Sequence, residues 1–374
     1  MARRAQPLTH VVATAALCPP GPPQPGWVAI DEGVIVEVGF GPASADALDL
    51  GSAVLTPGFI DLQVNGVGEV DFASADPDGW RRAARAQLEH GVTGYCPTLV
   101  SAPLDEYPPA LERARGARFD AKDRLLPAII GVHLEGPFLG GAPGAHPVPL
   151  LRTADCDWLH GVLDDFPDLV SIVTLAPEAD PNLAATRMLH ERGVRVSLGH
   201  STATYEEALA AADDGARLVT HLYNGMGRLH HRAPGLAGAA LDDERLTPTL
   251  IADLVHVHPV SLRLAIGRKR NIALVTDRVA VEGMRVTDGA VRLEDGTLAG
   301  STLSMDNAVR NVNGLGAPIE RAVEMAATIP AQALGLTDRG RIVPGARADL
   351  VALDPSSLAV RAVWLAGELA HGSP

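Results

Sequence analysis

Cysteine, long apolar runs and excess positive charge are all lacking in this sequence. Three cysteines occur among 374 residues, at Cys18, Cys96 and Cys156, and no two of them form a C-x-x-C pair. This spacing argues against a disulfide framework or a thiolate zinc site, and it fits a reducing cytoplasm. No apolar run approaches the roughly 20 residues that a membrane-spanning helix needs. The sequence therefore predicts a cytoplasmic protein without a membrane partner.

The charge balance is acidic. Thirty-one Lys and Arg residues stand against 45 Asp and Glu residues, which gives a net charge of −14. Such a chain should repel nucleic acid and anionic membranes, and an anionic small-molecule substrate would need a local positive pocket. The hydrophobic content of 47% supports a large core, in one large domain or in one large and one small domain.

The chain changes its rhythm near residue 56. Residues 1–55 have the pattern of short strands, including a hairpin over 27–39 that turns at 31–33. From there on, apolar strands alternate with helical segments. The predicted strands are 59–64, 91–99, 128–134, 169–175, 194–198, 217–222, 249–253 and 272–276. After them, 284–298 has the pattern of a hairpin with turns at 288–289 or 295–296.

The alternation predicts an α/β fold. Near-continuously apolar strands that alternate with helices indicate a parallel sheet buried on both faces, and eight such units indicate a (β/α)8 TIM barrel. A doubly wound open sheet is the alternative, but a glycine fingerprint after the first strand is absent. Residues 340–374 are too few to fold alone. We expect them to join residues 1–55 in a small β-sandwich domain, which leaves 56–339 as the barrel.

Polar residues stand where the predicted barrel strands end. They are Asp61, Gln63 and Asn65 after the first strand, Glu135 after the third, and His200, His221, His256 and Asp277 after the fifth to the eighth. The active site of such a barrel lies at these strand ends, so we expect the side chains to meet at one mouth.

Glu135, His200 and His221 match a catalytic metal site with three protein ligands and an open position for water. Taken singly, each histidine could instead be a hydrogen-bonded structural residue, and Glu135 could cap a helix or pair with an arginine. Asp277 could be an N-cap or an ion-pair partner. Beside a metal site, it could exchange protons with water and with a leaving amine.

A basic cluster at 228–232 lies in the loop after the sixth strand. Most basic loops are simply solvated. At the mouth of a barrel, however, this loop could supply the positive charge that an anionic substrate needs. Arg232 is our candidate for a phosphate ligand.

Seven motifs resemble one known family. They are TPGFID at 56–61, HLEGPF at 133–138, GAHP at 144–147, LGHS at 198–201, THLYNGM at 220–226, LVTD at 274–277 and GSTLSM at 300–305. Together they resemble the N-acetylglucosamine-6-phosphate deacetylases of the amidohydrolase superfamily. The resemblance implies hydrolysis of the acetamide of N-acetylglucosamine 6-phosphate, to glucosamine 6-phosphate and acetate, in amino-sugar catabolism or recycling.

The resemblance also implies a role for individual residues. Metal binding falls to Glu135, His200 and His221, acid–base catalysis to Asp277, and polarisation of the acetamide carbonyl to His146. The implied substrate contacts are Ala145, Asn224, Gly225, Arg232, His256, Leu303, Ser304 and Met305. Arg232 and His256 would hold the phosphate with the help of a partner subunit, in a homodimer.

The first strand distinguishes this chain from many superfamily members. Gln63 and Asn65 stand where those members carry His-x-His. This implies a single divalent ion per subunit, with these two amides outside its ligand set. We expect zinc, although iron, manganese and cobalt also suit such ligands.

Two departures from the family pattern affect the expected pocket. Leu254 stands where the family usually has the glycine of an Asp-Gly-x-His turn, and Arg278 stands where a small residue is usual. Two other functions therefore stay open. One is a deacetylase of another N-acyl amino sugar, and the other is a metal-free sugar-phosphate binding or regulatory protein on the same barrel.

Overall fold

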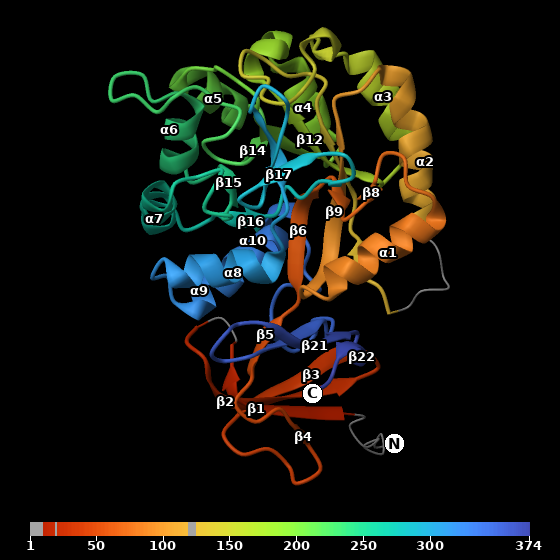
Figure 1. Ribbon diagram of the computed structural model, residues 1–374, viewed down its shortest axis with the longest axis vertical. Helices are drawn as coiled ribbons and strands as arrows, with labels where there is room; N and C mark the ends of the chain where they lie inside the picture. The colour runs from red at the N-terminus through yellow and green to blue at the C-terminus, as the bar shows by residue number, and fades with distance from the viewer. Residues whose placement is uncertain (1–9, 19–20, 119–124) are drawn as a thin grey trace.

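The computed structural model describes residues 10–18, 21–118 and 125–374. Its larger part is built around a ring of parallel strands (Figure 1). The strands are β6 (Phe59–Val64), β9 (Val92–Val100), β10 (Ala128–Ile129), β11 (Val132–Glu135), β12 (Val170–Leu175), β13 (Arg195–Leu198), β14 (Ala216–Val219), β15 (Thr247–Ile251) and β16 (Ala273–Val275). The ring closes where the Asp277 N–H donates to the Gln63 carbonyl at 2.9 Å. The predicted (β/α)8 barrel is confirmed, with its third strand in two pieces that both pair with β9.

Helices surround the ring, as the alternation predicts. They are α1 (Pro77–Leu88), α2 (Tyr107–Arg118), α3 (Cys156–Asp165), α4 (Ala184–Glu191), α5 (Tyr205–Asp213), α6 (Gly235–Asp242) and α7 (Pro259–Arg268). Sequence signals mark several starts. Asp76 accepts from the Gly79 N–H at the start of α1, and Thr204 forms a capping box with Glu207 at the start of α5. We did not predict α6, because its small apolar residues show no polar face.

Both ends of the chain build the small β-domain below the barrel in Figure 1. Its strands are β1 (His10–Leu17), β2 (Gln24–Asp31), β3 (Val34–Phe40), β4 (Leu48–Asp49), β5 (Val54–Pro57), β20 (Leu350–Leu353), β21 (Val360–Leu365) and β22 (Glu368–Gly372). β5 pairs with β20, and this pairing joins the two ends. The sheet folds back on itself where the Ile35 N–H donates to the Ala346 carbonyl at 2.8 Å. A separate apolar core fills the resulting sandwich. The boundaries at 55 and 340 stay a prediction.

The segment between β16 and β20 adds a small sheet and a helical layer. The strands β17 (Arg285–Thr287), β18 (Ala290–Arg292) and β19 (Leu298–Ser301) form an antiparallel sheet that uses both predicted turns. The helices α8 (Met305–Gly314), α9 (Ile319–Val323) and α10 (Ile329–Leu334) follow, with a π-helical turn between the last two. In the described ranges, no helix has the length and apolar character to cross a membrane.

β6 begins directly after β5, so it starts beside the small domain and runs away from it (Figure 1). The other barrel strands are parallel to it. Their carboxyl ends therefore form a mouth at the far end of the barrel from the small domain.

Candidate active site

Three side chains meet at this mouth. Glu135 ends β11, and His200 and His221 each follow the end of a strand by two residues. Glu135 Oε1 lies 3.1 Å from His200 Nε2 and 3.0 Å from His221 Nε2, and the two Nε2 atoms are 3.1 Å apart. All three residues are buried. These separations suit atoms that share one ion at bond lengths of about 2.0–2.2 Å.

The outer hydrogen bonds of the two histidines fix which ring nitrogen carries hydrogen. His200 Nδ1 lies 3.2 Å from the carbonyl oxygen of Ala142 and 3.1 Å from that of Pro143, and His221 Nδ1 lies 3.1 Å from that of Asn224. Carbonyls only accept, so both Nδ1 atoms are donors. In the neutral rings, both Nε2 lone pairs then face each other and the Glu135 carboxylate.

Three acceptors in mutual contact require a cation between them. Burial alone would raise the pKa of Glu135, but its close contacts with His200 and His221 outweigh burial and hold this pKa well below its usual range. Burial opposes a charge on His221 as well, yet the contact with Glu135 raises its pKa. A shared proton satisfies one of these contacts at a time, whereas a divalent ion satisfies all three. The cluster therefore fits a metal site.

Asp277 stands beside this cluster, just past the end of β16. Its Oδ1 accepts hydrogen bonds from Asn65 Nδ2 at 2.8 Å and from Gln63 Nε2 at 3.2 Å. Burial, and then the charge of Glu135, raise the pKa of Asp277 to about 6. A carboxyl group that titrates near neutral pH can both take up and release a proton.

His146 reaches the same site from the loop after β11. The Ser101 N–H donates to His146 Nδ1 at 3.4 Å, and the Ser101 hydroxyl lies 2.8 Å from the same atom. Burial, and then the neighbouring His200, lower the pKa of His146 to about 3, so the ring is neutral. Because Nδ1 accepts, Nε2 carries the hydrogen and is available to a substrate carbonyl.

A cavity of about 980 Å³ occupies the mouth. Predicted site residues that line it are Asn65, Glu135, Ala145, His146, His200, His221, Asn224, Gly225, His256 and Asp277. His256 Nδ1 is tied to Asp253 Oδ2 at 2.6 Å. Among the described residues, Arg82 is the one lysine or arginine in the lining, against Glu69, Asp71, Asp76 and Glu282.

The remaining predicted residues lie outside this lining. Gln63 reaches the site through its hydrogen bond to Asp277. Arg232 is exposed on the loop before α6, with its Nη1 2.8 Å from His231 Nε2. Leu303, Ser304 and Met305 are buried at the start of α8, where the Ser304 hydroxyl donates to Asp306. Neither Leu254 nor Arg278 lines the cavity.

Sequence reasoning missed part of the cavity wall. Tyr223, Glu69 and Arg82 line it, as do Val279, Ala280, Met284, Leu293 and Leu298 from β17–β19 and the loop before them, together called the β17–β19 region. Tyr223 lies inside the THLYNGM motif and could have been selected. The others belong to the loop after β6, to α1 and to the β17–β19 region, where no spacing rule points toward the mouth.

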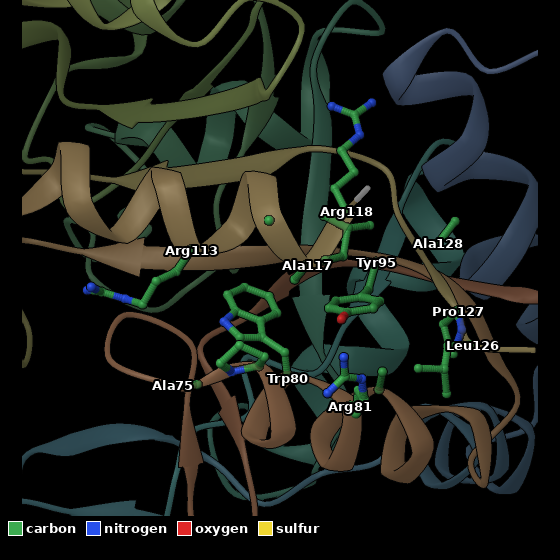
Figure 2. Close-up of a pocket in the computed structure, with 14 residues that line it drawn as sticks. Ala75, Trp80, Arg81, Tyr95, Arg113, Ala117, Arg118, Leu126, Pro127 and Ala128 are labelled. Atoms are coloured by element: carbon green, nitrogen blue, oxygen red, sulfur yellow. The ribbon is translucent and has the colours of Figure 1, made fainter. Parts of the chain in front are cut away.

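A second cavity, of about 330 Å³, lies between α1 and α2 (Figure 2). Trp80 and Tyr95 lie among its arginines, and the described residues of its lining include no histidine and no carboxylate. The arginines are engaged elsewhere. Arg81 pairs with Asp78 at 2.7 Å, Arg113 Nε donates to the Ala73 carbonyl at 3.0 Å, and Arg118 Nη1 donates to the Asp168 carbonyl at 2.5 Å. The groups suited to acid–base and metal chemistry are therefore at the mouth.

A (β/α)8 barrel with a buried Glu/His/His cluster and a carboxyl group beside it defines a class of metal-dependent barrel hydrolases. The sequence places the chain more narrowly. The model of the amidohydrolase family matches residues 54–370, so the chain belongs to the amidohydrolase family.

The relatives are amino-sugar phosphate deacetylases. The N-acetylgalactosamine-6-phosphate deacetylase of Escherichia coli O157:H7 is 38% identical, over 97% of this chain and 100% of the relative. The N-acetylglucosamine-6-phosphate deacetylase of Bos taurus is 41% identical, over 86% and 84%. The structure of a Mycobacterium smegmatis N-acetyl-D-glucosamine-6-phosphate deacetylase mutant, in complex with N-acetyl-D-glucosamine-6-phosphate, matches with a TM-score of 0.90, at 35% identity and over 96% and 99%. The predicted family resemblance is confirmed.

Proposed function

We propose that this protein hydrolyses the acetamide of N-acetyl-D-glucosamine 6-phosphate to D-glucosamine 6-phosphate and acetate, in amino-sugar catabolism or recycling. The observation that carries the proposal is the cluster of three buried acceptors with Asp277 and a neutral His146 beside it. A metal-free binding protein would gain nothing from three acceptors in mutual contact, so the cluster favours the enzyme.

Glu135, His200 and His221 would hold one divalent ion, which we propose is zinc. When bound, such an ion supplies Lewis acidity and makes a hydroxide-like nucleophile available near neutral pH. Asp277 takes the proton of the attacking water and delivers it to the departing amine. Asn65 and Gln63 keep its carboxyl group turned toward the cluster. The N–H of His146 donates to the acetamide oxygen as negative charge develops there.

The phosphate needs more positive charge than one copy of the cavity offers. Arg82 shares the lining with six carboxyl groups, those of Glu135 and Asp277 included, and Arg232 lies outside it. We propose a homodimer in which Arg232 of one subunit reaches the cavity of the other and holds the phosphate together with His256. Ala145, Asn224 and Gly225 would contact the sugar, and residues 303–305 would support that wall from behind. The reaction would take place in the cytoplasm.

N-acetylgalactosamine 6-phosphate is the second candidate substrate. The Escherichia coli relative that is named for this epimer is covered over its whole length. Leu254 is a further reason to test this epimer. It adopts a φ of 68° where the family usually has glycine, and it lies two residues before His256, which lines the cavity.

One experiment tests both candidates. Acetate release is measured with each sugar phosphate, before and after chelation and with Zn²⁺ added back. Metal-dependent release from the glucosamine derivative supports the proposal. Faster release from the galactosamine derivative would show that this epimer is the preferred substrate of the same reaction. No release from either, by protein that contains one equivalent of metal, would refute the deacetylase function.

A further inference from the structure

Directly beneath the Glu/His/His cluster, the barrel interior contains a polar layer. His133, Thr174, Ser197 and Thr220 come from or directly follow four neighbouring strands, and all are buried. His133 Nε2 lies 2.7 Å from Thr174 Oγ1, which lies 2.7 Å from Thr220 Oγ1. Thr220 Oγ1 in turn lies 2.6 Å from Ser197 Oγ. The four side chains thus form one continuous chain of hydrogen bonds across the barrel.

The direction of every hydrogen bond in this chain is fixed. His133 Nδ1 lies 3.1 Å from the Leu62 carbonyl, which can only accept, so Nδ1 is the donor. In the neutral ring Nε2 must accept, and Thr174 therefore donates to it. Thr174 then accepts from Thr220, and Thr220 accepts from Ser197. Thr174 and Thr220 each donate once and accept once, and Ser197 donates at the end of the chain, so the layer has a single arrangement of hydrogen atoms.

Each metal-ligand candidate touches this layer through its own backbone. His133 lies two residues before Glu135, and Thr174 is the partner of Glu135 in the β11–β12 register. Thr220 directly precedes His221. On the third side, a Cβ added to Gly199, next to His200, would lie 2.8 Å from Thr220 Cβ and 3.0 Å from Thr174 Cγ2. A displacement in the layer is therefore passed to all three ligands.

Packing does not explain the polar layer. Barrel interiors are commonly filled by Val, Ile and Leu, and valine has nearly the shape of threonine. Four buried polar groups are costly unless every one is satisfied, and a fully satisfied network is rigid. The benefit of this layer is therefore a fixed position for the residues above it.

We propose that the hydrogen-bond chain from Ser197 through Thr220 and Thr174 to His133 is a positioning layer that holds Glu135, His200 and His221 at metal-binding distances. The four residues are positioning residues and do not touch substrate. The inference rests on the proposed metal site.

The test compares Thr174→Val with Thr174→Ser, which keeps the hydroxyl. Zn²⁺ affinity is measured by competition with a chromogenic chelator, and unfolding of the metal-free protein is measured alongside. Outer partners of metal ligands typically contribute about 10–100-fold to affinity, so Thr174→Val should weaken Zn²⁺ binding by about that factor, while Thr174→Ser stays within about threefold of wild type. Ser197→Ala, which removes only the first donor, should have a smaller effect in the same direction.

Thr56→Val is the matched control. Thr56 is equally buried, but its hydroxyl donates to the Val351 carbonyl in the small domain. This variant should lose stability without losing Zn²⁺ affinity. If Thr174→Val and Thr220→Val also lose only stability, with Zn²⁺ affinity at the wild-type value, the positioning role is refuted and the metal site stands. If either threonine variant fails to fold, Ser197→Ala decides by the same affinity measurement. If wild-type protein binds no Zn²⁺, the metal site and the layer's role are refuted together.

Discussion

Replacing Asp277 by asparagine separates proton transfer from metal binding. The asparagine oxygen can still accept from Asn65 and Gln63, at the positions where Asp277 Oδ1 now accepts at 2.8 and 3.2 Å. Asp277 also has a φ of 48°, and asparagine is among the residues that best tolerate this left-handed conformation. The variant should therefore fold and keep its metal site, since Glu135, His200 and His221 are unchanged.

The expected loss is confined to turnover. A positioned acid or base contributes about 10²–10⁴-fold to the rate, and Asp277 is proposed to act twice, first on the water and then on the amine. We therefore expect a fall in kcat near the upper end, about 10³–10⁴-fold, which equals roughly 4–5 kcal/mol in the activation barrier.

The assay is steady-state acetate release, with the metal content of the same samples measured in parallel. Asp349→Asn is the matched control, because Asp349 is also a buried aspartate but pairs with Arg347 in the small domain. That variant should keep its kcat. If Asp277→Asn contains one equivalent of metal and turns over within about tenfold of wild type, Asp277 is not the proton carrier.

Three further predictions concern phosphate, metal and pH. Arg232→Ala should raise KM for the phosphorylated sugar by about 10²-fold while leaving the unphosphorylated sugar almost unaffected, and the exposed Arg361→Ala should change neither. Chelation should abolish acetate release and lower the unfolding temperature, and Zn²⁺ should restore both. Burial raises the pKa of Asp61 from 3.8 to about 6, so the native state binds this proton more tightly than the unfolded state does. Its contribution to stability should fall by roughly 3 kcal/mol as the pH rises from about 4 to 6, and urea unfolding of Asp61→Asn should lack this fall.

The sequence predicted those parts of the site whose signals are local. The apolar run 59–64 became β6 with the same bounds, and Glu135, His200 and His221 met because each is tied to the end of a parallel strand. The proton position of His200 could not be predicted, because it depends on the carbonyls of Ala142 and Pro143 in a distant loop. That of His221 depends on the conformation of its own loop, which brings the Asn224 carbonyl to the ring. Ser304 and its neighbours show a different limit, since a motif can belong to a family's site and yet pack its side chains into the core.

Backbone strain at the mouth and repulsion between its buried acceptors both lower the stability of the folded protein. His200, His221 and Asp277 all have positive φ angles, of 49°, 31° and 48°, a conformation that costs of order 1 kcal/mol or more for each non-glycine residue. The three buried acceptors add repulsion unless a cation lies between them. The barrel core holds this arrangement in place, and a bound divalent ion would relieve the repulsion only in the folded state. Folding and metal binding should therefore be coupled, which is why chelation is expected to lower stability as well as turnover.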